Sequence, residues 1–311
     1  MTRPQPGLAL ALALALGSLI PANAARSEVT TAASPAPPRL YADSQMVVRD
    51  RISVEVVGQG PDLILIPGLA SSRETWRATA DRLRGHYRLH LVEVAGFAGE
   101  PARGNSEGPV LIATAEAIDA YVRDQGLSPA TVIGHSLGGT MILWLAVHHP
   151  EDLRRALVVD ALPSFATVMM GPGATPEQVR PMAEAIRHAP PIPPSANTRM
   201  IANLVSEGPN RAMVEAWYAS SNSAVVANAL ADDLELDLRP DLAAIHTPIL
   251  LLYPDNTPAG APPGAMDGAY KAMFAGAPGV KLSGVDHSLH FIMLDQPTAF
   301  AARLDAFLAT P

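Results

Sequence analysis

Apolar and polar residues follow two distinct patterns in the first part of the chain. Around Ile52, Val54 and Val56 apolar positions alternate with polar ones, which is typical of a strand with one exposed face. Residues 63–66 form a continuous apolar run that ends at Pro67-Gly68, which is typical of a strand covered on both faces in a parallel sheet. The pattern therefore predicts a sheet with a buried centre.

Helical and strand-like patterns then alternate as far as residue 160. Such alternation favours a parallel sheet whose strands are joined by right-handed helical crossovers. In chain order, the predicted elements are a helix near 73–83, a strand near 87–94, a helix at about 110–124, a strand at 131–133, a helix at about 137–148 and a strand at 156–160.

A long segment without strand patterns interrupts this alternation. Residues 163–240 contain proline-rich breaks and several helix-like stretches. The clearest of these stretches lie around 176–187, 211–220 and 224–234. We interpret the whole segment as a helical lid inserted into the sheet domain.

The strand pattern returns after the insertion. An apolar run at 248–253 predicts a further buried strand, a weaker strand follows near 280–282, and a helix is expected at about 297–308. Residues 41–162 and 241–311 are therefore predicted to form one α/β core.

The N-terminal residues have the composition of an export signal. Residues 1–24 combine Arg3, an apolar run of 13 residues at 8–20 and the small residues Ala22-Asn23-Ala24, as signal peptides do. A membrane-spanning helix needs about 20 apolar residues, so the run favours a cleaved signal over an anchor. Residues 25–40, rich in Ala, Pro, Ser and Thr, are predicted to form a flexible linker. We therefore expect a secreted protein, periplasmic or extracellular, without an integral membrane segment after cleavage.

Composition narrows the functional classes. The chain has 311 residues, of which 48% are hydrophobic and 17% charged, which suffices for a large core. It contains no cysteine, which excludes disulfides, cysteine nucleophiles and zinc sites built on thiolates. The formal net charge is −8, which argues against nucleic acid as a partner.

A serine motif lies between a predicted buried strand and a predicted helix. Gly134-His135-Ser136-Leu137-Gly138 fits the pattern G-x-S-x-G. In this context the serine is expected on a sharp strand-to-helix turn, a nucleophile elbow, where its hydroxyl stands clear of the sheet. Flanking glycines allow the neighbouring backbone to approach. Ser136 is therefore the candidate nucleophile.

A serine hydroxyl needs a histidine to take its proton and a carboxylate to orient that histidine. In strand-turn-helix sites of this kind the acid and the histidine follow the serine in the chain. The histidines after Ser136 are His148, His149, His188, His246, His287 and His290. The first two end the helix after the serine, where a solvated cap is expected. His246 precedes a strand, at the wrong end for a site built where strands end. His287 and His290 follow the last strand and remain as candidates.

From Leu63 onward the chain resembles the α/β-hydrolase superfamily, in its lid-bearing serine esterase and lipase-like branch. Pro67-Gly68-Leu69 with Trp76 resembles the loop after the third strand, which usually reads His-Gly. Residues 93–99 resemble a segment that usually reads Asp-x-x-Gly-x-Gly, with Ala98 at its second glycine. The resemblance implies the α/β-hydrolase fold, a mostly parallel twisted sheet flanked by helices, with an inserted helical lid.

The resemblance also assigns the base and the oxyanion hole. In this family an aromatic residue follows the base, and a proline opening the last helix stands seven positions on. His290, Phe291 and Pro297 have this spacing. By the same resemblance, the backbone amides of Leu69 and Leu137 are expected to form the oxyanion hole.

Two aspartates compete for the role of the acid. The family usually places the acid after the strand that here ends at Tyr253, which points to Asp255, although the usual spacing falls on Asn256. Some relatives carry the acid one strand earlier, where Asp160 stands. The sequence favours Asp255 and keeps Asp160 as the alternative.

These residues predict a serine hydrolase that cleaves carboxylic esters through an acyl-enzyme, acting on a small-molecule ester without cofactor or metal. With the same triad, amide cleavage, acyl transfer and hydrolysis of a carbon–carbon bond are alternatives. A catalytically inactive binding protein of the same fold is another. The predicted lid carries adaptable apolar side chains suited to an acyl or aromatic group. They are Phe165, Met169, Met170, Met182, Met200, Met213 and Trp217.

Overall fold

A computed structural model describes residues 38–191, 194–256 and 264–309 of the chain. The predicted signal peptide and most of the predicted linker lie outside the described residues. Within the described residues, no helix has both the length and the apolar character that crossing a membrane requires.

Eight strands form one sheet in the order β1-β2-β4-β3-β5-β6-β7-β8. Strand β1 pairs antiparallel with β2, β2 pairs antiparallel with β4, and the remaining neighbours pair in parallel. The strands are β1 (Gln45–Val48), β2 (Ile52–Gly58), β3 (Asp62–Ile66), β4 (Arg88–Val94), β5 (Ala130–His135), β6 (Leu153–Val159), β7 (Ile249–Asp255) and β8 (Val280–Asp286).

Helices cover both faces of the sheet, which explains the continuous apolar runs of its central strands. In β3, Ile64 and Ile66 pack with α2 (Leu111–Asp124) and α3 (Leu137–His148) on one face. Leu63 and Leu65 point to the other face. That face is covered by the 3₁₀ helix Arg73–Trp76, α1 (Arg77–Leu83), α10 (Ile292–Asp295) and α11 (Pro297–Ala309).

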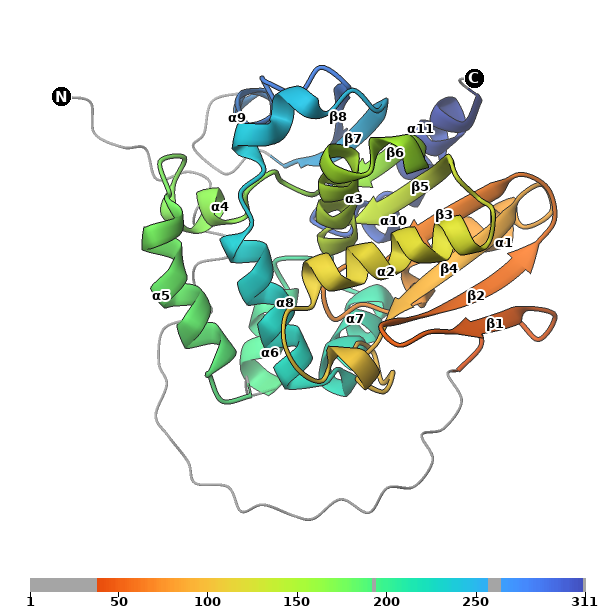
Figure 1. Ribbon diagram of the computed structural model, residues 1–311, viewed down its shortest axis with the longest axis horizontal. Coiled ribbons are helices and arrows are strands. Elements are labelled where there is room, and N and C mark those ends of the chain that lie inside the picture. Colours follow the sequence, from red (N-terminus) through yellow and green to blue (C-terminus); the bar gives the residue numbers. More distant parts are fainter. Residues whose placement is uncertain (1–37, 192–193, 257–263, 310–311) are drawn as a thin grey trace, which may run out of the picture.

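Between β6 and β7 the described residues form five α-helices within the segment predicted as a lid, followed by a 3₁₀ helix at Arg239–Ala244. Figure 1 shows α5 to α8 gathered on one side of the molecule, beside the sheet. The five are α4 (Ala166–Met170), α5 (Pro176–Arg187), α6 (Pro194–Ile201), α7 (Pro209–Ser220) and α8 (Ser223–Glu235). One further helix, α9 (Ala265–Met273), lies between β7 and β8.

The predicted fold class, a mostly parallel α/β sheet flanked by helices, is confirmed. The sequence pattern missed β1, which lies at the edge of the sheet and has two half-buried and two exposed residues. It also shortened β8, whose burial does not alternate regularly because it is the other edge strand. Edge strands bury less side-chain surface, so their apolar patterns are weak.

Strained backbone gathers at the carboxyl ends of the strands. Six non-glycine residues of the described chain have a positive φ, and five of them follow a strand within four residues. Such conformations cost free energy and cluster at functional sites. The five are Ala70 after β3, Ala98 after β4, Ser136 after β5, Asp160 after β6 and His287 after β8.

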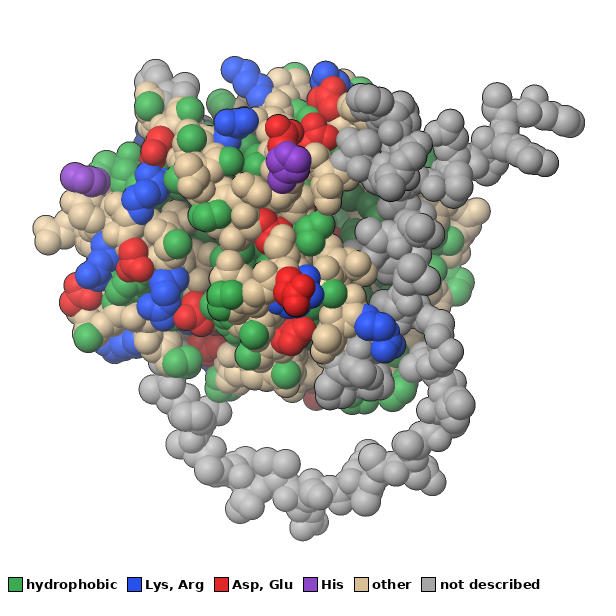
Figure 2. All heavy atoms as spheres, turned by 180° about the vertical axis from the view of Figure 1, so that it is seen from behind, with side chains coloured by type: hydrophobic (Ala, Val, Ile, Leu, Met, Phe, Trp, Pro, Cys, Tyr) green, Lys and Arg blue, Asp and Glu red, His purple; other side chains and the backbone are tan. Residues whose placement is uncertain are grey.

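The surface carries charges of both signs. On the face seen in Figure 2, basic and acidic side chains are interspersed among apolar and uncharged ones. This face therefore presents no extended patch of a single charge of the kind that binds nucleic acid.

Candidate active site

Ser136 lies on a sharp turn between β5 and α3. Its backbone has φ 52° and ψ −123°, and its amide donates to the carbonyl of Val159 at 2.9 Å. The turn requires the flanking glycines, because a Cβ on Gly138 would lie 2.6 Å from the carbonyl oxygen of Pro67. A Cβ on Gly134 would lie 2.6 Å from the carbonyl oxygen of Gly138. The structure thus has the strand-turn-helix geometry of a nucleophile elbow.

The loop after β3 passes directly beside Ser136. A Cβ on Gly68 would lie 3.0 Å from the Cβ of Ser136, so only glycine fits this close approach without displacing its neighbours. Leu69 follows Gly68, and Leu137 is the first residue of α3. Because β3 and β5 are neighbours in the sheet, both candidate oxyanion amides lie in segments adjoining Ser136.

His290 is held against both β5 and β6. Its Nδ1 lies 2.6 Å from Oδ2 of Asp160, which directly follows β6. Its carbonyl oxygen accepts a hydrogen bond from Nε2 of His135 at 3.1 Å, and the two imidazole rings are 4.6 Å apart. Since His135 directly precedes Ser136, these contacts bring the loop after β8 to the serine.

The carboxylate that contacts His290 is Asp160, the alternative acid, and not Asp255, which the sequence favours. Asp255 ends β7 in register with Asp286 of β8. Its buried Oδ1 has no hydrogen-bond partner among the described residues. The physical reason lies in the strand order: β6 adjoins β5, whereas β7 is one strand further from the serine. The geometry therefore favours Asp160.

His287, the other candidate base, is exposed and has a left-handed backbone conformation. Its carbonyl oxygen accepts a hydrogen bond from Nε2 of Gln296 at 2.7 Å, which shapes the turn before His290. His287 therefore contributes its backbone to the loop, and His290 remains the candidate base.

His135 was not singled out by sequence reasoning, although it lies inside the serine motif. Burial lowers its pKa well below the ordinary value, and the neighbouring His290 lowers it further. The ring is therefore neutral, and since a carbonyl oxygen accepts from Nε2, that nitrogen carries the proton. Its buried Nδ1 has no hydrogen-bond partner among the described residues.

A carboxyl of α8 also faces this region. Burial raises the pKa of Asp233 on α8 to about 7, while a hydrogen bond with Thr140 of α3 and the proximity of His290 act in the opposite direction. No motif marks Asp233 in the sequence, because its hydrogen bond with Thr140 depends on how α8 packs on α3. Asp233 is therefore about half ionised at pH 7 and mostly protonated at lower pH.

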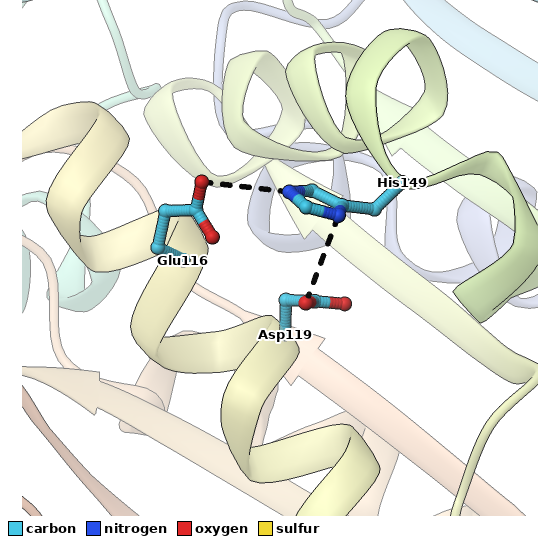
Figure 3. A group of neighbouring side chains, drawn as sticks. All are labelled: Glu116, Asp119 and His149. Carbon is cyan, nitrogen blue, oxygen red and sulfur yellow. Dashed lines mark hydrogen bonds and ion pairs between the residues drawn. The ribbon is translucent and has the colours of Figure 1, made fainter.

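Glu116 and Asp119 from the middle of α2 and His149 at the end of α3 remote from Ser136 form the cluster of Figure 3. Nε2 of His149 lies 3.4 Å from a Glu116 oxygen, and its Nδ1 lies 4.0 Å from Asp119. Arg123 pairs with the same Asp119 oxygen at 2.8 Å. Arg123 thus already balances the charge of Asp119, and we assign no metal to the cluster.

Sheet topology, the strained serine and the loop histidine together define the α/β-hydrolase class of proteins. The chain belongs to the alpha/beta hydrolase family, which it matches over residues 63–303.

Relatives with named activities align with parts or most of the chain. A pimeloyl-[acyl-carrier protein] methyl ester esterase from Aeromonas salmonicida is 39% identical over 126 residues, which cover 40% of this chain and 48% of that protein. The chain thus matches about half the length of that relative. An N-formylmaleamate deformylase from Pseudomonas putida is 27% identical over 261 residues, which cover 82% of this chain and 91% of that protein.

Solved structures share the fold. A hydrolase from Pseudomonas aeruginosa superimposes with a TM-score of 0.68 at 20% identity, covering 86% of this chain and 99% of that one. At this identity the similarity concerns the fold alone.

Proposed function

We propose that the protein hydrolyses carboxylic esters of small molecules through an acyl-enzyme on Ser136. The observation that carries the proposal is the 2.6 Å contact between His290 and Asp160 beside a serine on a strained turn. Nδ1–H of His290 donates to Asp160, which leaves Nε2 unprotonated and able to accept a proton. This is the protonation state that a general base needs.

The reaction follows the serine-hydrolase scheme. His290 takes the Ser136 proton as the oxygen attacks the ester carbonyl, and the amides of Leu69 and Leu137 stabilise the oxyanion. His290 then protonates the leaving alcohol, and the acyl group stays on the serine. Water, activated by His290, releases the acid and restores the serine. No cofactor or metal takes part.

The relatives support ester cleavage and leave one competitor. The A. salmonicida relative is named as a methyl ester esterase, although only about half its length is matched. The P. putida relative, matched over most of both chains, is named as a deformylase. We therefore keep carbon–nitrogen cleavage by the same residues as the second candidate.

The decisive experiment compares two serine variants. Ser136→Ala should abolish hydrolysis of short nitrophenyl esters and labelling by a fluorophosphonate probe, while the thermal melt stays cooperative. The exposed Ser106 supplies the control, since Ser106→Ala should change neither readout. Undiminished turnover in Ser136→Ala would reject the proposal. Amide analogues assayed in parallel separate the two candidate reactions.

We also propose that residues 1–24 direct export and are then removed. The proposal rests on the charge of Arg3, the apolar run and the small residues before Ala25. N-terminal sequencing of the protein from the periplasm or medium of a bacterial host should begin at Ala25. Recovery in the cytoplasm with Met1 intact would contradict it.

A further inference from the structure

Asp160 has a second partner besides His290. Its Oδ2 accepts from His290 at 2.6 Å, and its Oδ1 accepts a hydrogen bond from the hydroxyl of Tyr270. The two donors lie on either side of β8 in the chain, since Tyr270 belongs to α9, before β8, and His290 follows β8. Each oxygen of this nearly buried carboxylate, whose side chain is 11% exposed, therefore has its own donor.

Tyr270 is itself fixed in place. It is 4% exposed, and its ring stacks on that of Tyr253 with centroids 4.4 Å apart and planes at 17°. The Tyr253 hydroxyl in turn donates to Asp267 of α9 at 2.7 Å, so strand β7 and helix α9 are joined by both contacts. The phenol therefore cannot turn away from Asp160 without breaking the stack.

Burial and the charge of Asp160 raise the pKa of Tyr270 well above its ordinary value. The hydroxyl therefore keeps its proton at every pH at which His290 works, and it can only donate to the carboxylate. A permanent donor of this kind stabilises the ionised form of an acid and fixes its rotamer.

We propose that Tyr270 is a positioning residue for the triad, which holds Asp160 ionised and aligned so that Asp160 orients His290. The proposal rests on the proposed function, since it assigns to Tyr270 a role in the same site. In this arrangement Tyr253 of β7 supports the tyrosine that contacts the acid after β6.

The test is the variant Tyr270→Phe, which removes the hydroxyl and keeps the stacked ring. Losing a hydrogen bond to a charged group should lower kcat by about 5- to 30-fold, with KM changed less than about twofold. The acidic limb of the kcat/KM profile should move to higher pH, because the Asp160 carboxylate with one donor fewer attracts the imidazolium form of His290 more strongly. The other groups facing His290, namely His135 and Asp233, are unchanged in this variant.

Tyr121→Phe is the matched control. Tyr121 of α2 is also buried, and its hydroxyl hydrogen-bonds at 2.7 Å to His90. His90 lies on β4, three positions from β6 in the sheet order and therefore away from Asp160. Both variants should lose thermal stability, but only Tyr270→Phe should change kcat and the pH limb. In addition, Tyr270→Phe should have no further effect in an Asp160→Asn background, since the hydroxyl acts through that carboxylate.

A spectroscopic readout does not depend on substrate turnover. The Nδ1 proton of His290 should give a low-field NMR signal that moves further downfield in Tyr270→Phe. An unmoved signal, or kcat and pH limb equal to those of the unaltered protein, would overturn the role of Tyr270. Retained activity in Ser136→Ala would instead overturn the proposed function, so the two failures are distinguishable.

Discussion

Asp160 and His290 are 130 residues apart in the chain, yet their side chains meet at 2.6 Å. The sheet order explains the contact. Asp160 directly follows β6, which adjoins the serine-bearing strand β5, and the loop after β8 reaches across β7 to bring His290 there. The left-handed conformation of Asp160, with φ 49°, is consistent with a position held for function.

The identity of the acid can be tested by two isosteric substitutions. Asp160→Asn should lower kcat by on the order of 10³- to 10⁴-fold, because an amide cannot stabilise the imidazolium of His290 and favours the wrong tautomer. Asp255→Asn should change kcat by less than about threefold. Steady-state kinetics on a nitrophenyl ester measure both. A large loss in Asp255→Asn with full activity in Asp160→Asn would restore the assignment that the sequence favours.

The turn at Ser136 should depend on Gly138. In Gly138→Ala the new methyl group would meet the carbonyl oxygens of Pro67 and Ile66 at 2.6 and 2.7 Å, and rigid backbone cannot yield as a flexible side chain does. We expect a loss of at least about 2 kcal/mol in the free energy of unfolding, together with a fall in kcat. Denaturant titration and ester kinetics test this.

Gly85→Ala is the control for that substitution. Its Cβ would meet no atom within 4 Å, so stability should be unchanged or slightly higher. Equal stabilities of the two variants would show that the approach of β3 to the turn is not tight.

Chelation should leave the protein unaffected. Asp119 in the cluster of Figure 3 is already paired with Arg123 at 2.8 Å, and His149 lies between the two carboxylates. Treatment with EDTA should therefore change neither kcat nor Tm. A drop in Tm that zinc or manganese restores, and that Glu116→Gln abolishes, would instead identify a structural metal there.

Much of the fold could be predicted from the sequence because the central strands are buried on both faces. The runs at 63–66, 132–133 and 249–253 are apolar throughout, and each lies in a parallel strand. Three of the helices between β6 and β7 were predicted to within two residues at each end, since α5, α7 and α8 combine clear apolar spacing with proline or asparagine at their starts.

The site could be predicted where a short motif marks a residue, as around Ser136 and His290, but not where it depends on contacts between distant segments. The turn around Ser136 is a local motif. The contact between Asp160 and His290 depends on strand order and on the path of the loop after β8, neither of which is visible in one sequence. Tyr270 likewise contacts Asp160 only because α9 packs against the end of β7.

A buried charge cluster near β4 should make stability depend on pH. Arg73 lies 3.0 Å from Glu100, 3.4 Å from Glu93 and 3.7 Å from Glu55, and all four side chains are at most 5% exposed. One guanidinium thus faces three carboxylates, with Arg103 adding a second cation at Glu100. An excess of buried negative charge is costly and favours protonation of one acid.

That acid is Glu93. Burial raises its pKa from 4.5 to about 8, and the nearby Glu100 adds to the effect, although Arg73 and Ser72 act against it. Its Oε2 accepts hydrogen bonds from Ser72 and Arg73, whereas its buried Oε1 has no partner among the described residues, which leaves Oε1 as the oxygen that can carry the proton. The folded protein therefore binds a proton that the unfolded chain releases near pH 4.5.

Because of this difference, the free energy of unfolding falls as the pH rises. Stability contributed by the proton is complete below about pH 4.5 and is lost as the pH rises to about 8. Glu93→Gln mimics the protonated acid at every pH, so its stability relative to the unaltered protein should rise by on the order of 3 kcal/mol between pH 5 and 9. Urea titrations at both pH values measure this difference. A constant offset between the two proteins would mean that Glu93 stays ionised in the fold and that Arg73 outweighs its burial.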